Sequence, residues 1–140
     1  MDATFLQRRL VLSNDVEEVR QLATFVEGIC EELGFDPMVS MQMNLAMEEA
    51  VVNVIDYAYP AGTKGEVEIE AKTTEGCLEF VISDSGVAFD PTAKAEVDTT
   101  LSAEERQIGG LGIHLVRHLM DSVEYEWRDG RNVLRLRKKL

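Results

Sequence analysis

The stretch PMVSMQMNLAMEEAVVNVIDYAY, residues 37–59, is apolar around most of its circumference when it is drawn as a helix. Asp36 and Pro37 suit the N-cap and the first turn of this helix, and Pro60 ends the pattern. A helix that is apolar on nearly every side is largely buried. We therefore expect the helix to be covered by other elements of the chain.

On the C-terminal side of this helix, alternating apolar segments predict two β-hairpins. GEVEIEAKTT (65–74) and CLEFVISD (77–84) meet at Glu75-Gly76, and EYEWRDGRNVLRLRKK (124–139) turns at Asp129-Gly130. Turns of this kind join antiparallel strands. The basic last strand alternates as an edge strand does, and we expect its charges to protect that edge.

On the N-terminal side, TFLQRRLVL (4–12) predicts a strand, and residues 15–33 predict a helix. Asn14, with Glu17 three residues on, is the expected N-cap of this helix, and Gly34 is expected just after its end. The predicted apolar face consists of Val16, Val19, Leu22, Ala23, Val26, Ile29 and Cys30.

Residues 85–110 show little periodicity, and a further helical pattern, GIHLVRHLMDSV, follows at 112–123. A long stretch without secondary structure is usually a functional lid or a linker. The order β-α-α-β-β-lid-α-β-β predicts an α+β fold, a two-layer sandwich in which helices cover one face of a mostly antiparallel sheet. No repeat or linker divides the sequence, so we expect one domain over residues 1–140.

The composition excludes several classes of function. A net charge of -12 argues against nucleic-acid binding, because phosphate contacts need a basic surface. No apolar run approaches the roughly 20 residues of a membrane helix, and the N-terminus lacks a signal-peptide pattern, so we expect a cytoplasmic protein with no membrane contact. Cys30 and Cys77 lie outside any CxxC spacing, which leaves metal and dithiol sites unsupported. In so acidic a chain, a phosphorylated ligand needs backbone amides, a metal ion or a well-placed basic residue.

Polar residues form a stripe on the apolar helix. Gln42, Glu49, Asn53 and Asp56 fall within a band of about 60°. A carboxylate and an amide one turn apart on a buried face need polar partners, which a ligand, a metal ion or water would provide. An exposed face would need none, and the helix alone does not decide between these alternatives.

Two glycine-rich segments border the long loop. Asp84-Ser85-Gly86 follows an apolar strand, where a carboxylate can accept a hydrogen bond from the exocyclic amine of a base. Gly109-Gly110-Leu111-Gly112 opens a helix, and the first amides of a helix form an anion site. Arg106, just upstream, could reach a terminal phosphate. Taken singly, these features are also consistent with an ordinary turn, a plain helix start and a solvated charge.

Taken together, EEAVVN (48–53), DSGVAFDP (84–91) and GGLGIHLVRHLMD (109–121) resemble the three nucleotide boxes of the gyrase, histidine-kinase and MutL ATPase superfamily in order and spacing. Nearly the whole chain is similar to the small anti-sigma-factor serine/threonine protein kinases of that superfamily. The resemblance implies a histidine-kinase-like ATPase fold, ATP and Mg²⁺ as ligands, and an ATP lid over residues 92–108.

The resemblance also assigns roles to individual residues. It implies that Glu49 is the general base and that Asn53 ligates magnesium. It implies that Asp84 binds the adenine amine and that Gly86 makes room for the ring. Arg106 would meet the γ-phosphate from the lid. The phosphate-binding loop that it implies consists of Gly110, Leu111, Gly112 and Ile113.

Four positions of the nucleotide site need separate comment. Ala88 replaces the second glycine usual in the DxGxG box, and alanine fits there if its φ is negative. Tyr57 replaces a frequent histidine. Asp56 adds a negative charge that either weakens ATP binding or contacts magnesium or water. Asn132 lies near where relatives often carry a threonine beneath the nucleotide.

The function implied by the resemblance is an anti-sigma factor that phosphorylates a serine or threonine of an anti-sigma antagonist protein and also binds a sigma factor. A homodimer is favoured on the same ground. Other interpretations stay open: an ATP-dependent protein-binding switch without kinase activity, a histidine-kinase ATPase domain acting in trans, or a degenerate fold that binds no nucleotide. Nucleotide-binding motifs alone do not separate binding from turnover.

Overall fold

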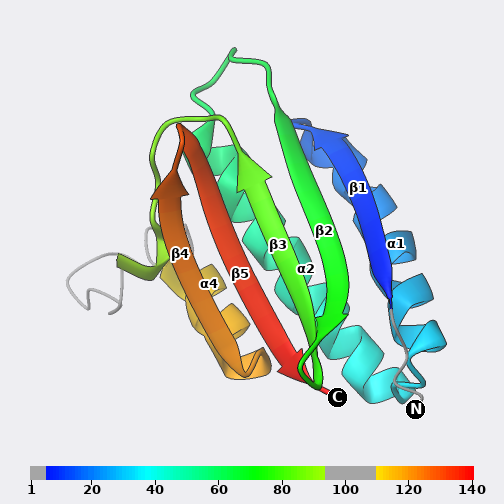
Figure 1. The fold of residues 1–140 in the computed structure, drawn as a ribbon. Helices are drawn as coiled ribbons and strands as arrows, with labels where there is room; N and C mark the ends of the chain where they lie inside the picture. Colours follow the sequence, from blue (N-terminus) through cyan, green and yellow to red (C-terminus); the bar gives the residue numbers. More distant parts are fainter. Residues whose placement is uncertain (1–5, 94–109) are drawn as a thin grey trace.

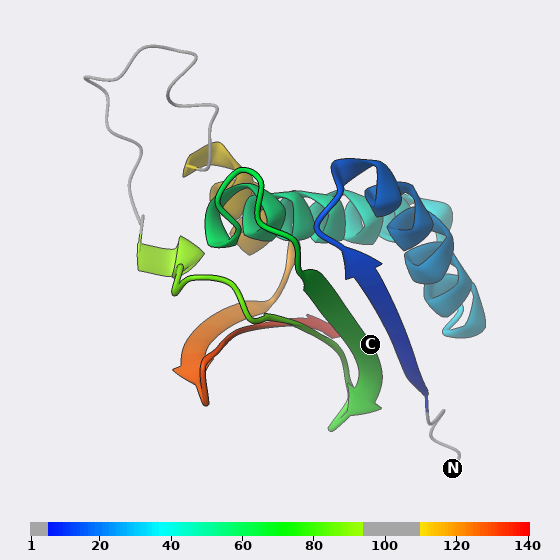
Figure 2. The same ribbon diagram turned by 90° about the horizontal axis from the view of Figure 1, so that it is seen from above.

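The structure, a computed structural model, describes residues 6–93 and 110–140. It has two layers, a five-stranded sheet and a row of helices that covers one face of the sheet (Figures 1 and 2). In the described part of the chain, the other face of the sheet has no helix over it. The predicted α+β two-layer architecture is therefore confirmed.

The sheet has the strand order β1-β2-β3-β5-β4, and every neighbouring pair is antiparallel. The strands are β1 Gln7–Ser13, β2 Glu66–Thr74, β3 Cys77–Asp84, β4 Ser122–Arg128 and β5 Arg131–Lys139. Glu75 and Gly76 have φ of 48° and 77°, and Asp129 and Gly130 have φ of 54° and 76°. Two successive positive φ values are what a tight hairpin turn requires, so both predicted turns are confirmed.

Within the described residues, the helical layer contains three α-helices and a short 3₁₀ turn before the first of them. The elements are η1 Val16–Val19, α1 Arg20–Glu32, α2 Pro37–Ala58 and α4 Gly110–Leu119, and a second 3₁₀ turn, η2 Pro91–Ala93, follows β3. The carboxylate of Asp36 accepts a hydrogen bond from the backbone N–H of Val39 at 3.0 Å, so the predicted cap of α2 is confirmed. Helix α2 lies in the middle of the layer, with α1 and α4 packed on either side.

The core lies between α2 and the covered face of the sheet, as the apolar sequence of α2 predicts. The fully buried large side chains include Leu22 of α1, Met43 and Met47 of α2, and Ile69 and Phe80 of the sheet. Among the described residues, no helix is long and apolar enough to span a bilayer.

The prediction of an Asn14 cap on the first helix is wrong by one residue. Asp15 is the N-cap of η1, the 3₁₀ turn that precedes α1, and its carboxylate accepts the backbone N–H of Glu17 at 2.9 Å. The amide of Asn14 instead binds the carbonyl of Thr63 at 2.6 Å and the N–H of Gly65 at 3.2 Å. The turn after α2 thus competes for Asn14, and the helix starts later. Val16 and Ala23, which were predicted on the buried face of this helix, are exposed.

The prediction that the last strand lies at an edge is also wrong. Strand β5 lies between β3 and β4, so β1 and β4 are the edges. The basic side chains of β5 instead find carboxylates on the uncovered face of the sheet. Arg137 binds the buried Glu79 at 2.7 Å, and Arg135 binds Glu126 at 2.8 Å. Cross-strand pairing with neighbouring acidic residues therefore explains the charges of this strand.

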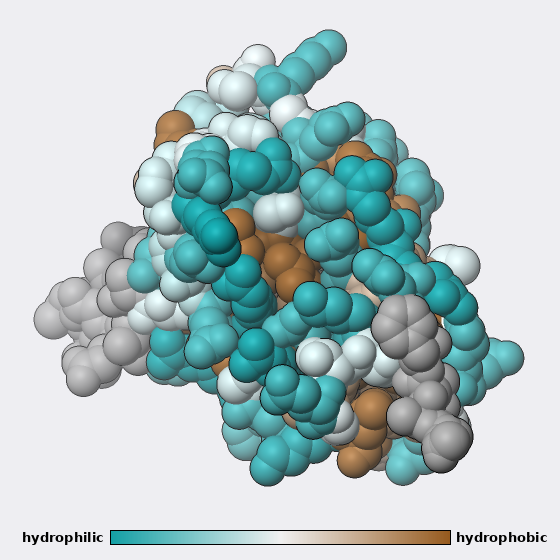
Figure 3. Space-filling model, viewed as in Figure 1, coloured by the Kyte–Doolittle hydropathy of each residue, from teal (hydrophilic) through white to brown (hydrophobic). Residues whose placement is uncertain are grey.

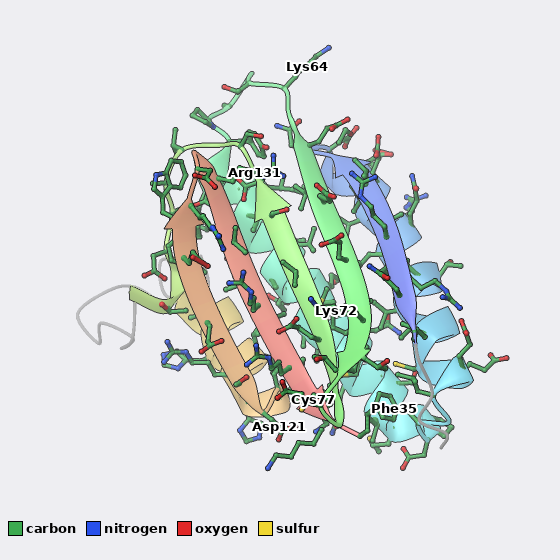
Figure 4. The ribbon with its side chains drawn as sticks, in the orientation of Figure 1. Phe35, Lys64, Lys72, Cys77, Asp121 and Arg131 are labelled. Atoms are coloured by element: carbon green, nitrogen blue, oxygen red, sulfur yellow. The ribbon has the colours of Figure 1, made fainter. Side chains whose placement is uncertain are left out.

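The uncovered face of the sheet is mostly hydrophilic, with a small apolar area near its centre (Figure 3). Lys72 and Arg131 lie on this face (Figure 4). Arg131 reaches Ser85 and Glu68. The candidate site lies on the other side of the sheet, the side that the helices cover, around the end of β3.

Candidate functional site

Asp84, the last residue of β3, has one side-chain oxygen without a hydrogen-bond partner. The residue is 0% exposed. Its Oδ1 accepts hydrogen bonds from the backbone N–H of Gly86 at 2.8 Å and from Nδ2 of Asn132 at 2.9 Å. Its Oδ2 is buried and has no partner among the described residues. Buried carboxylate oxygens are seldom left unpaired, so Oδ2 is available to accept a hydrogen bond from a bound molecule.

The surroundings of Asp84 act on its charge in opposite directions. Burial raises the pKa of its carboxyl above the ordinary range. Hydrogen bonds from Asn132 and Gly86, and the charge of Arg131, lower the pKa and so favour the ionised form. Asn132 and Gly86 therefore do two things: they orient the carboxylate, and they help it to remain an acceptor.

Asn132, on β5 opposite Asp84, has all of its hydrogen-bonding capacity engaged within the protein. Its Nδ2 donates to Asp84 and, at 2.8 Å, to the carbonyl of Val87. Its Oδ1 accepts from the backbone N–H of Phe89 at 2.9 Å and from the hydroxyl of Tyr125 at 2.5 Å. A carbonyl only accepts and a backbone N–H only donates, so the orientation of the amide is determined by its partners. Asn132 therefore holds Oδ1 of Asp84 and leaves Oδ2 free.

We expect Asn132→Asp to lower the free energy of unfolding by about 1–3 kcal/mol at pH 7.5, because it sets a carboxylate against Asp84 and a carbonyl. Each carboxyl would raise the folded-state pKa of the other. The penalty would therefore be present at pH 7.5 and disappear as the pH falls toward the ordinary carboxyl pKa near 4. Urea unfolding at pH 7.5 and 5 measures it. Tyr125→Phe is the control, with a loss of about 1 kcal/mol at both pH values. Equal losses for Asn132→Asp at both pH values would contradict the role of Asn132.

Gly86 is required by the close approach of α2. A Cβ at this position would lie 2.2 Å from the carbonyl oxygen of Ala58 and 2.8 Å from its carbon. The next residue, Val87, donates its backbone N–H to that carbonyl at 2.8 Å. The loop after β3 is thus held against the end of α2. This packing requirement for glycine does not depend on a ligand, whereas the resemblance implies a glycine that makes room for a base.

Gly86→Ala is expected to lower the free energy of unfolding by roughly 1–3 kcal/mol, because backbone must move to admit the methyl group. Gly28→Ala provides a matched control. A Cβ at Gly28 meets no atom within 4 Å, and alanine in a helix interior is favoured over glycine by roughly 0.5–1 kcal/mol. Chemical denaturation of the two variants should therefore give shifts of opposite sign. An unchanged midpoint for Gly86→Ala would show that the loop adjusts freely.

The loop after β3 is also anchored to α2 by an aromatic stack. The rings of Phe89 and Tyr57 lie 5.1 Å apart between centroids, at 19° to each other. The stack joins the loop after β3 to the last turn of α2. Ala88 is exposed and is not among the described non-glycine residues with positive φ. The condition under which alanine fits the second glycine position is therefore met.

Asn53 and Glu49 lie one turn apart on α2, as the helix predicted. Asn53 is 7% exposed, and its buried Nδ2 has no hydrogen-bond partner among the described residues. Glu49 is half-buried. Asn53 precedes Ala58 by five residues, which is roughly 7 Å along the helix axis. The contact between Ala58 and Gly86 therefore places the end of β3 and the polar part of α2 in the same region of the molecule.

Asp56 does not share the environment of this polar pair. It is exposed, and it lines a separate hollow with Val16, Pro60 and Lys64. Asp56 faces the loop that follows α2, so its surroundings differ from those of Glu49 and Asn53. Gln42, at the other end of the stripe, is half-buried. Of the four residues in the predicted stripe, we therefore keep only Glu49 and Asn53 in the candidate site.

Helix α4 begins at Gly110 and packs beside α2. Ile113 and Val116 of α4 are buried. The helix therefore begins within the predicted phosphate loop, and its first turn contains Gly110, Leu111 and Gly112. Gly109, Arg106 and most of the predicted lid lie outside the described residues. Thr92, where the predicted lid begins, is described and binds Asp90 through its backbone N–H at 2.8 Å.

The described residues of the candidate site offer three kinds of chemistry. The free oxygen of Asp84 can accept one hydrogen bond from a buried donor. Asn53 offers an unpaired amide, and Glu49 offers a carboxylate one turn away. The start of α4 offers backbone N–H groups to an anion. Phe89, Tyr125 and the network of Asn132 were not predicted, because their contacts depend on strand register and no local motif marks them.

Comparison with known proteins shows the family to which the chain belongs. Residues 12–138 match the family model described as histidine kinase-like ATPase domain. The chain is 34% identical over 113 residues to the serine-protein kinase RsbW of Listeria monocytogenes, covering 78% of this chain and 72% of that protein. It is 32% identical over 94 residues to the serine/threonine-protein kinase BtrW of Bordetella bronchiseptica, covering 67% of this chain and 66% of that one.

Two solved structures share the fold. One contains the RsbU and RsbW domains of a Mycobacterium tuberculosis protein, with a TM-score of 0.68 at 14% identity, and covers 96% of this chain and 32% of that one. The other is the SiaB-SiaC complex of Pseudomonas aeruginosa, with a TM-score of 0.51 at 16% identity, and covers 94% of this chain and 89% of that one. From the family match and the identity to its relatives, the chain belongs to the histidine kinase-like ATPase domain family and, within it, to the RsbW serine-protein kinases.

Proposed function

We propose that this protein is an ATP-dependent serine/threonine protein kinase that phosphorylates an anti-sigma antagonist protein and binds a sigma factor. The observation that carries the proposal is the unpaired Oδ2 of Asp84, oriented by Asn132 and Gly86. The RsbW relatives are named serine-protein kinases, which supports the assignment of the transfer step. The specific partners come from the resemblance to anti-sigma kinases.

Asp84 would bind the base. The 6-amino group of adenine donates hydrogen bonds, and an ionised carboxylate can only accept them. Guanine presents a carbonyl oxygen at the same position, which would face the carboxylate with no hydrogen between them. A buried polar group left unpaired in this way costs about 1–3 kcal/mol. Adenine is therefore the preferred base.

Asn53 would hold Mg²⁺ through its side-chain oxygen, and the N–H groups of residues 110–113 would hold the phosphates. The buried amide of Asn53 fits this role because its Nδ2 has no hydrogen-bond partner among the described residues, so no hydrogen bond of that group fixes the orientation of the amide. The metal supplies charge neutralisation that a protein of net charge -12 lacks. Arg106, which lies outside the described residues, is proposed to meet the γ-phosphate.

Glu49 would act as the general base. The incoming serine or threonine hydroxyl would transfer its proton to the carboxylate while its oxygen bonds to the γ-phosphorus and the bond to ADP breaks. Glu49 is half-buried and stands next to Asn53 on the helix, so it is accessible to a hydroxyl brought by another protein. We also propose one cytoplasmic domain over residues 1–140, a lid at 92–108 and a homodimer.

Calorimetry with ATP and ADP, with and without magnesium, tests the nucleotide site. We expect magnesium to strengthen ATP binding to the wild type, and we expect Asn53→Ala to lose most of that magnesium effect. The second step is phosphotransfer from radiolabelled ATP to purified anti-sigma antagonist domains encoded in the same genome. No ATP binding would refute the whole proposal. Binding without transfer to any of these domains would favour a non-catalytic switch.

A further inference from the structure

Three large apolar side chains form an exposed stripe on the N-terminal half of α2. Met38, Met41 and Leu45 are 59%, 60% and 43% exposed. Their spacing of three and four residues puts them on one face of the helix. The other exposed large hydrophobic residues of the described chain lie on other elements, on β1, η1, the loop after β3, β4 and the C-terminus. Apolar anchors at helical spacing on a free surface are typical of a site where a partner helix binds.

A hollow of about 230 Å³ lies beside the stripe, between α1 and α2. The two helices run next to each other in the helical layer (Figure 2), on the side of the molecule away from Figure 3. Val19 and Leu22 line the hollow on one side, and Met41 and Leu45 line it on the other. An apolar side chain of a partner could enter here.

The polar residues that line the hollow present acceptor oxygens to it, whereas Nδ2 of Asn44 donates to the carbonyl of Ser40 at 3.4 Å. Asn44 and Glu48 both line it. Oδ1 of Asn44 is buried and has no hydrogen-bond partner among the described residues. Glu48 is exposed, and the described lining includes no Lys, Arg or His. A binding partner must therefore bring donors, and a cation satisfies both groups best.

The stripe leads to the proposed general base. Leu45 and Glu49 are four residues apart, so they lie about 40° from each other around the helix and about 6 Å along it. Met38 is about 16 Å from Glu49 along the axis. A protein segment that covers the stripe would thus end beside Glu49, where the hydroxyl must arrive.

We propose that Met38, Met41, Leu45 and the adjoining hollow are the docking surface for the phosphoacceptor protein. The acceptor lays a helix on this surface, with an apolar face toward the stripe and a Lys or Arg toward Asn44 and Glu48. This inference rests on the proposed kinase function and adds the surface that selects its substrate.

A second copy of the chain fits this surface less well. In a two-fold symmetric dimer the same patch meets itself. The acceptors of Asn44 and Glu48 from both copies would then share one interface, and the described lining of the hollow supplies no cation to pair with them. Charge complementarity therefore favours a different protein with a basic apolar segment.

The test uses the full chain and the antagonist protein that the wild type phosphorylates. For the double variant Met41→Glu/Leu45→Glu we expect the KM for the antagonist to rise about tenfold or more, with kcat at saturating antagonist and the Kd for ATP unchanged. Glu48→Lys should raise the KM as well, because it repels the cation of the acceptor. Val11→Glu, an exposed apolar residue on the uncovered face of the sheet, is the control and should leave the KM unchanged.

An unchanged KM in the double variant would overturn the inference while the proposed function stands. Loss of sigma-factor binding with an unchanged KM would make the sigma factor the occupant, and a change of oligomeric state by light scattering would make it a second copy; both results overturn the inference. A wild type that phosphorylates no antagonist would instead overturn the proposed function on which the inference rests. A higher KM together with unchanged ATP affinity supports both.

Discussion

Glu49→Gln should reduce kcat for phosphorylation of the antagonist by about a thousandfold and leave ATP binding within about threefold of the wild type. General-base catalysis contributes roughly 10²–10⁴ to a rate, and an amide cannot accept the hydroxyl proton. The substitution preserves shape at a half-buried position, so it should not disturb the helix. Single-turnover transfer from radiolabelled ATP measures kcat, and calorimetry measures the Kd for ATP.

The control for Glu49→Gln is Asp56→Asn, the same change of carboxylate to amide on the same helix. Asp56 is exposed and lines a hollow away from Asn53, so its kcat should match that of the wild type. If Glu49→Gln keeps wild-type kcat, Glu49 is not the base and the proton must leave by another route. If both variants lose activity equally, the loss comes from the changed charge of the helix and not from removal of a general base at Glu49.

Asp84→Asn should weaken ATP binding by about a hundredfold, which corresponds to about 2.7 kcal/mol. Asn132 and the N–H of Gly86 both donate to Oδ1, so the new side chain must place its oxygen there. Its NH₂ group then occupies the position of Oδ2 and faces the adenine amine, donor against donor. The oxygen at position 6 of inosine triphosphate would accept from that NH₂, so the preference for ATP over inosine triphosphate should fall. Calorimetry with both nucleotides measures the two effects.

The stability of Asp84→Asn provides its control. Because the folded-state pKa of Asp84 is raised, the carboxyl stabilises the fold at low pH and this contribution is lost as pH rises through that pKa. At pH 7.5 the wild type therefore has the cost of a buried charge, which the amide removes. We expect the free energy of unfolding at pH 7.5 to be equal or higher in the variant. Weaker ATP binding together with a large loss of stability would mean that the network, and not base recognition, has failed.

The sequence by itself determined the elements of this fold and the positions of its main polar groups. The turns at Glu75-Gly76 and Asp129-Gly130, the cap at Asp36 and the buried character of α2 all follow from interactions within a few residues. The sequence also predicted the place of Asp84 at the end of an apolar strand, because the alternation of a strand is a local pattern. Turn geometry, capping and hydrophobic periodicity are local, so a single sequence shows them directly.

The tertiary structure alone decided which elements meet. The insertion of β5 between β3 and β4 sets Asn132 opposite Asp84, 48 positions away in the chain, and so leaves one carboxylate oxygen free. Asn14 binds the turn after α2 instead of capping the first helix. The exposure of Met41 depends on how α1 packs against α2. Strand order and helix packing depend on the free energy of the whole chain, in which contacts between distant segments outweigh local preference. The chemistry of the site therefore comes from residue types visible in the sequence, while their hydrogen bonds come from the fold.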